Sequence, residues 1–244
     1  MLPWTTSRPR LNVKDRISIL VTDLDGSVLH SPRLGFGHAS LRFKPVRLNA
    51  DGVRDMTDHP GLDVLVGLLF AEGATERRGE PIRGITRLEK LVFLTLEEGG
   101  FSKAKADYSY KPYELGPYSK EVVDYIEALK QAKLVKSEIE DFESHRDVLD
   151  AVAATRSIEG AGTPGKVEVY ALTDKGLQIG EKLFGTMSPA QRKALTDIKR
   201  RFNQIPLAEL LKYVYTNYRQ MTSKSKILDD VLGVGSRPDL QRAT

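Results

Sequence analysis

LVKSEIE, residues 134–140, alternates Val135, Ser137 and Ile139 with three charged residues. A period of two residues is typical of a strand, whereas the stretch before it repeats its apolar residues with the period of a helix. VEVYAL, residues 167–172, is a second strand candidate. We expect the two stretches to pair as a hairpin with a long Gly-rich connection. The pattern leaves open which face of residues 134–140 is buried.

Helices are expected on both sides of this hairpin. The first begins at Gly61, because apolar residues follow it at helical spacing as far as Phe70. Thr86 and Glu89 have the spacing of a capping box, so a second helix should begin there and end at Gly99. Together with the hairpin, these helices predict a mainly α fold with a small β-hairpin wing.

Four further elements follow from local signals. Gly116-Pro117 predicts a third helix over residues 117–132, because proline costs little in a first helical turn. Thr173 is placed to cap a helix over residues 174–184, and Ser188 opens a basic helix that ends near residue 202. A last helix is expected over residues 207–218, followed by a tail from residue 228.

Composition limits the classes of protein to which the chain can belong. It has 244 residues, no cysteine and four histidines, and the histidines share no ligand spacing. A disulfide framework or a thiolate metal site is therefore excluded, and we expect no cofactor. The longest apolar run, residues 62–71, is too short to span a membrane, and the first residues lack the apolar core of a signal peptide. The expected location is the cytoplasm, with no membrane partner.

Positive charge is concentrated near the C-terminus. The whole chain carries a net charge of +4, but residues 186–226 contain nine basic and only two acidic residues, a local net charge of +7. Such a segment favours polyanionic partners. A solvated basic helix face remains the alternative interpretation.

Residues 1–60 differ in composition from the rest and predict an N-terminal arm, irregular or rich in β structure, with a strand candidate at residues 17–21. Directly after that candidate, Asp23 and Asp25 lie in a DxDGS sequence that resembles the first motif of haloacid-dehalogenase-like phosphatases. Such an enzyme needs a parallel βαβ sheet, and no strand–helix alternation follows residue 60. We therefore interpret the motif as a turn that ends a strand, and we expect the protein not to be an enzyme.

The order of expected elements resembles a winged helix, and three sequences narrow the resemblance. ITRLEKLVFL (residues 85–94) and the Gly-Pro-Tyr-Ser segment (residues 108–119) are similar to the Panacea (SocA-like) antitoxin domain and to prokaryotic winged-helix proteins, and YALTDKG (residues 170–176) is similar to PadR- and MarR-like regulators. The resemblance covers residues 61–184. It implies a winged-helix domain at 61–184. Composition and charge outside that range predict an N-terminal arm at 1–60, a basic helical extension at 185–227 and a tail at 228–244.

The resemblance implies a transcriptional regulator that binds double-stranded DNA, or, as the alternative, an antitoxin-like or adaptor protein that binds a toxin-like partner protein. We expect a homodimer through the end helices. The predicted recognition helix at 117–132 has an acidic surface, which counts against simple DNA binding. The residues expected to contact DNA are Arg87, Lys90, Lys103, Lys105, Lys111, Tyr118, Ser119, Lys120, Arg156 and Lys166.

Tyrosines 108, 110, 113 and 118 lie among three of these lysines. They are suited to stacking on a partner. The competing interpretation is that their rings pack a loop onto the core and leave the hydroxyls at the surface.

Overall fold

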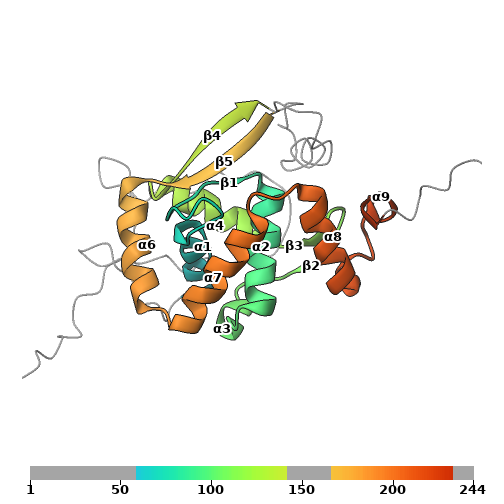
Figure 1. Cartoon of the computed structure of the whole chain (residues 1–244), viewed down its shortest axis with the longest axis horizontal. Helices are drawn as coiled ribbons and strands as arrows, with labels where there is room; N and C mark the ends of the chain where they lie inside the picture. Colours follow the sequence, from blue (N-terminus) through green and yellow to red (C-terminus); the bar gives the residue numbers. More distant parts are fainter. Residues whose placement is uncertain (1–58, 142–165, 233–244) are drawn as a thin grey trace, which may run out of the picture. The chain divides into compact units, whose positions relative to one another are not determined.

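The computed structural model describes residues 59–141 and 166–232, all within the unit Met56–Thr244. This part of the chain is mainly helical with a small antiparallel sheet (Figure 1). The helices are α1 (Pro60–Phe70), α2 (Ile85–Glu98), α3 (Ser102–Lys105), α4 (Lys120–Gln131), α6 (Asp174–Thr186), α7 (Pro189–Phe202), α8 (Leu207–Asn217) and α9 (Leu228–Leu232), with a 3-10 turn η1 (Arg219–Met221). None of the described helices is both long and apolar enough to cross a membrane.

The expected pairing of two strands is confirmed. β4 (Val135–Asp141) pairs antiparallel with β5 (Lys166–Leu172), with Val135 opposite Leu172. A short strand that the sequence did not predict, β1 (Ile82–Arg83), pairs with the other side of β5 and gives the sheet order β1-β5-β4. Residues 142–165, which join β4 to β5 and include Arg156, lie outside the described residues.

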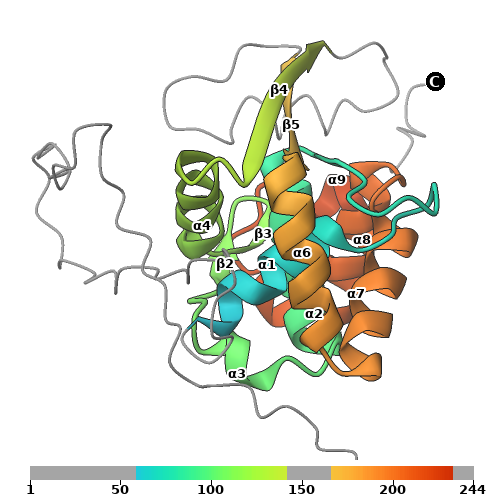
Figure 2. The same cartoon turned by 90° about the vertical axis from the view of Figure 1, so that its left-hand side faces the viewer.

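The two strands of the β4–β5 hairpin differ in burial. On β5, Val167, Val169, Tyr170 and Leu172 are buried, whereas on β4 only Val135 at the base is buried and the residues from Glu138 onward are exposed. Figure 2 shows that the hairpin projects away from the helices. The buried face left open by the sequence is therefore that of Val135.

Helix α2 is the centre of the helical body and packs against α1, α4, α7 and α8 (Figure 1). Its apolar side chains Leu88, Leu91 and Val92 are fully buried. Because neighbours surround it on several sides, its polar residues from Thr86 to Lys90 are buried as well. The burial of charged groups in α2 distinguishes this helix from an ordinary amphipathic one.

Two predicted helix starts are wrong. The capping box at Thr86 is absent, because α2 begins at Ile85 with Gly84 as its N-cap, at φ +82°, and Thr86 and Glu89 are buried. The third helix begins at Lys120 rather than Pro117, because residues 116–118 form a strand. In contrast, the caps at Thr173 and Ser188 are confirmed, since each side chain accepts a hydrogen bond from a backbone N–H of the first turn.

The C-terminal helices pack onto the same core. Tyr215 is buried, the Tyr218 ring lies 4.9 Å from the Phe93 ring, and the Tyr213 ring lies 4.8 Å from the Phe202 ring, measured between centroids. The start of the expected tail is helical, since it forms α9. Residues 1–58, which hold Asp23 and Asp25, and residues 233–244 lie outside the described residues, so the predicted arm, the phosphatase-like motif and the domain boundaries remain predictions.

Candidate functional site

A second hairpin is inserted between α2 and α4. Strands β2 (Lys111–Tyr113) and β3 (Gly116–Tyr118) pair antiparallel, with Tyr113 opposite Gly116. Gly116 has φ +87°, and a Cβ atom there would lie 2.7 Å from Cε1 of Tyr215 in α8. Glycine therefore serves two purposes at this position, because it allows the turn and it lets the hairpin approach α8.

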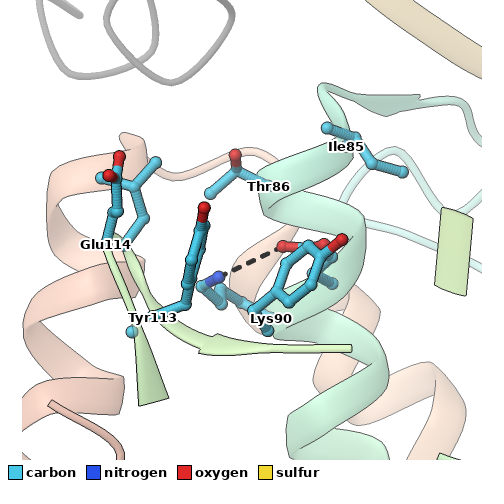
Figure 3. A pocket seen from close by; sticks show the side chains of 9 residues that line it. Ile85, Thr86, Lys90, Tyr113 and Glu114 are labelled. Carbon is cyan, nitrogen blue, oxygen red and sulfur yellow. Dashed lines mark hydrogen bonds and ion pairs between the residues drawn. The ribbon is translucent and has the colours of Figure 1, made fainter. Parts of the chain in front are cut away.

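A small cavity of about 60 Å³ lies between this hairpin and the N-terminal half of α2 (Figure 3). α2 contributes Thr86, Glu89 and Lys90, and the hairpin contributes Tyr113, Glu114 and Tyr118 among its lining residues. A cavity of this volume can hold a few water molecules or the tip of one side chain.

An exposed aromatic group stands over the cavity. The side chain of Tyr113 remains 47% exposed, although its ring centroid is only 5.1 Å from that of Tyr118. Lys111 Nζ lies 5.9 Å from the centroid of the Tyr118 ring, within the range of a cation–π contact. The hairpin thus presents aromatic surface and one cation to solvent.

The floor of the cavity contains a buried acid–base pair. Lys90 Nζ donates to the carbonyl oxygen of Pro117 at 2.8 Å. It also lies 3.4 Å from Glu89 Oε2, the ion pair that is drawn as a dashed line in Figure 3. Burial raises the pKa of Glu89 to about 7, and Lys90 opposes that shift. Burial also lowers the pKa of Lys90, against the attraction of Glu89. The pair ties α2 to the inserted hairpin and places a carboxyl group and an amine within the cavity wall.

The rest of the hairpin approach is packed through tyrosines. Tyr108 donates from its hydroxyl to the carbonyl oxygen of Gly61 at 2.7 Å, and Tyr110 donates to that of Glu89 at 2.9 Å. These two rings therefore pack the loop onto the core as the competing interpretation expected, but their hydroxyls point inward rather than to the surface. Tyr113 alone among the four is clearly exposed.

Three of the residues expected to contact DNA face the protein interior, which corrects that expectation. Arg87 donates to the carbonyl oxygens of Phe202 and Ile205, at 2.9 and 2.7 Å. Lys90 is 1% exposed in its side chain, and Ser119 is fully buried with its hydroxyl donating to Glu121. The physical reason is that α7 and the inserted hairpin cover the face of α2 that the sequence pattern left to solvent.

The remaining expected residues that the structure describes are exposed or half-buried but do not form one surface. Lys105 pairs with Glu97 at 2.7 Å, and Lys120 pairs with Asp124. Lys103 and Lys105 lie on α3, whereas Lys166 begins β5 at the far end of the projecting hairpin, and both views place these elements at opposite ends of the described body (Figures 1 and 2). Of these residues, Tyr118 lines the cavity, and Lys111 lies over the Tyr118 ring.

The β2–β3 hairpin and the cavity beneath it were not predicted from the sequence. A signal was present, because Lys111-Pro112-Tyr113 and Gly116-Pro117-Tyr118 are two short segments separated by two residues, the spacing of a tight hairpin. Pro112 and Pro117 argued against a hairpin here, because proline is rare inside strands.

No acidic or histidine cluster suited to a metal ion occurs among residues 59–141 and 166–232. Comparison of the sequence with protein-family models and with curated proteins finds no match. The candidate site therefore has to be interpreted from its own chemistry.

Proposed function

We propose that residues 60–186 form a winged helix. The support is the order α1, β1, α2, α4, β4, β5, with β5 lying between β1 and β4 in the sheet. In this proposal α4 follows α2 as the second helix of the helix-turn-helix, and β4–β5 is the wing. The inserted β2–β3 hairpin replaces the short turn that usually joins such helices.

We propose further that this winged helix binds a protein partner, as an antitoxin-like or adaptor protein does. The observation that carries the proposal is the exposed Tyr113 above a small cavity that contains the Glu89–Lys90 pair, on a hairpin that is held by Lys90 from α2 and by Tyr215 from α8. A rigid aromatic group beside a pocket is the usual anchor of a protein interface. The partner would cover Tyr113 and offer a polar group to Glu89 or Lys90.

The charge of α4 and the wing supports the same preference. The lysines of α4 are paired with carboxylates, Lys120 with Asp124 and Lys130 with Glu127 and Glu168. Lys136 on β4 is likewise paired with Glu138. Because phosphate contacts supply most of the affinity for nucleic acid, cations that are already neutralised contribute little to it.

The proposal is tested by comparing the proteins that co-purify with the full-length chain and with a Tyr113→Ala variant. We expect one partner to be retained by the wild type and by a Glu181→Ala control, an exposed residue on α6, and to be reduced at least tenfold with Tyr113→Ala. The identified partner is then titrated against all three purified proteins. Equal affinities for the three would refute the site. If no co-purifying protein, once purified, binds the wild type directly, the proposed function is refuted.

Sequence-specific DNA binding, as a transcriptional regulator, is the second candidate. The basic segment of residues 186–226 and the exposed Lys103 and Lys111 favour it. A gel-shift assay on the DNA upstream of the protein's own gene, at two salt concentrations, distinguishes the candidates. Regulator function predicts a specific shift that weakens steeply with salt, whereas the protein-binding proposal predicts no sequence-specific shift.

A further inference from the structure

Strand β4 forms an edge of the described three-stranded sheet, since its one neighbour there is β5. Hydrogen bonds made by residues next to the β4–β5 ladder fix which backbone groups of β4 point away from β5. Gly84 N–H donates to the Glu168 carbonyl at 2.9 Å, so the backbone groups of Glu168 point toward β1. Ile139 lies opposite Glu168, and therefore its own N–H and C=O point to the open edge.

The other end of the β4–β5 ladder gives the same alternation of hydrogen-bonded and non-bonded residue pairs. Thr173 N–H donates to the Leu134 carbonyl at 3.0 Å, so these two residues form a hydrogen-bonded pair at the base of the hairpin. Because bonded and non-bonded pairs alternate along an antiparallel ladder, Lys136, Glu138 and Glu140 bond to β5. Ser137 and Ile139 consequently present N–H and C=O groups along the open edge that no strand of the described sheet uses.

The side chains of this edge are also exposed. Ile139 is 71% exposed, the most exposed large hydrophobic side chain in the described part of the chain. An exposed edge that carries a hydrophobic residue is a template for pairing with another strand. The charges beside it decide which strand fits.

We propose that β4 pairs antiparallel with β4 of a second copy of this chain, about a two-fold axis that passes through Glu138. In this register Ser137 of one copy and Ile139 of the other exchange backbone hydrogen bonds, so the free groups on both edges are used. Glu138 then faces its own counterpart in a non-bonded pair, a like-charge contact that the Lys136 ammonium group, 2.9 Å from Glu138 in each copy, offsets. The interaction is isologous, as a closed dimer requires.

Charge complementarity favours this partner. The register sets Lys136 of each copy opposite Glu140 of the other, an opposite-charge pair across the strands. Within each copy Lys136 already pairs with Glu138 at 2.9 Å, and Arg83 pairs with Glu140 at 2.7 Å. The two copies together therefore bring equal numbers of cations and carboxylates to one face of the joined sheet. On the other face, the two Ile139 side chains become diagonal neighbours and cover one another.

The natural absence of cysteine makes a decisive cross-linking test possible. The non-bonded pair at the axis would hold the two Cα atoms of residue 138 about 4.5 Å apart, which suits a disulfide. We expect the Glu138→Cys variant to form a disulfide-linked dimer under mild oxidation at least tenfold faster than the Lys193→Cys control, an exposed residue on α7. Equal rates for the two variants would overturn the proposal.

A second variant tests the backbone contribution. Ile139→Pro removes an N–H that β5 does not use, so the β4–β5 ladder keeps its bonds while the edge loses a donor. Sedimentation should show a wild-type dimer that dissociates at least tenfold more readily with Ile139→Pro. A dimer of unchanged affinity would place the interface elsewhere, and a wild type that stays monomeric at every concentration would refute it outright. This inference does not depend on what the winged helix binds.

Discussion

Lys199 Nζ donates to the carbonyl oxygen of Leu69 at 2.7 Å, so that a residue of α7 closes the last turn of α1. The lysine side chain is fully buried, and its ammonium group lies where a helix C-terminus favours a cation. Burial lowers the pKa of Lys199 to about 7, although Glu80 opposes the shift.

The pH dependence of stability should reveal this lysine. Because its pKa is lower in the folded state than in the unfolded state, the unfolded chain binds more protons between pH 7 and about 10, and stability rises with pH over that window. Urea unfolding at pH 7 and pH 9 should show this rise, and Lys199→Met should reduce it by about 2 kcal/mol. An identical rise in wild type and variant would mean that Lys199 titrates normally.

Glu80 should have the opposite signature. Burial alone would raise its pKa, but hydrogen bonds from Thr75, Gln204 and Asn203 outweigh that effect and lower the pKa to about 2. The stability that Glu80 contributes is thus present above pH 4.5 and is lost as the pH falls from 4.5 toward 2. Glu80→Gln should cost about 2 kcal/mol at pH 7 and flatten the acid limb of the stability profile, measured by urea unfolding. An acid limb as steep as that of the wild type would contradict the assignment.

Arg87 and Arg83 allow a buried arginine to be compared with an exposed one. Arg87 is buried and donates to two carbonyl groups, whereas Arg83 is about half exposed and pairs with Glu140. Arg87→Met should cost about 2–4 kcal/mol in the free energy of unfolding, because Phe202 and Ile205 lose their donor. Arg83→Met should change it by less than about 0.5 kcal/mol. Similar costs for both would remove the distinction between an internal and a surface arginine.

A double-mutant cycle should show that Glu89 and Lys90 are coupled. Each single change, Glu89→Gln or Lys90→Met, leaves a buried polar partner without its ion and should cost about 2–4 kcal/mol. The double variant should cost at least about 1 kcal/mol less than the sum of the two, because the second change removes the stranded group. Additive costs would show that the pair, 3.4 Å apart, interacts weakly.

Two glycines separate the effect of backbone strain from that of a steric clash. Gly100 has φ +72° and nothing within 4 Å of a hypothetical Cβ, whereas the Cβ at Gly116 would meet the Tyr215 ring. Gly100→Ala should cost about 1 kcal/mol, and Gly116→Ala should cost at least about 1 kcal/mol more. Thermal unfolding of both variants measures the difference, and Gly116→Ala should also weaken partner binding by displacing the hairpin. Equal stability losses would mean that α8 yields to the added methyl group.

The sequence predicted the elements whose signals are local. The alternation around Ser137 and the caps at Thr173 and Ser188 depend on neighbours within a few residues, and the structure confirms the strand pairing and both caps. The β2–β3 hairpin was missed because Pro112 and Pro117 contradict ordinary strand preferences, although each proline lies opposite the other in the pair.

The candidate site was less predictable, because burial in α2 depends on distant segments. Arg87 becomes internal only when residues more than 100 positions later fold over it. Lys90 becomes internal when Pro117 returns to it from the inserted hairpin. A pattern of charged residues on one helix carries no information about either event, so both were assigned to solvent.

The long-range hydrogen bonds of Arg87 and Lys199 also determine which fragments of the protein can fold alone. Each cation donates to a carbonyl group on the other side of the predicted domain boundary at residue 184. Arg87 of α2 donates to Phe202 at the end of α7, and Lys199 of α7 donates to Leu69 of α1. A fragment that stopped at that boundary would strand the buried guanidinium of Arg87 and uncover the last turn of α1. Helices α7 and α8 are thus part of the same core as α1 and α2. We expect protease digestion to release no stable fragment that ends between α6 and α7.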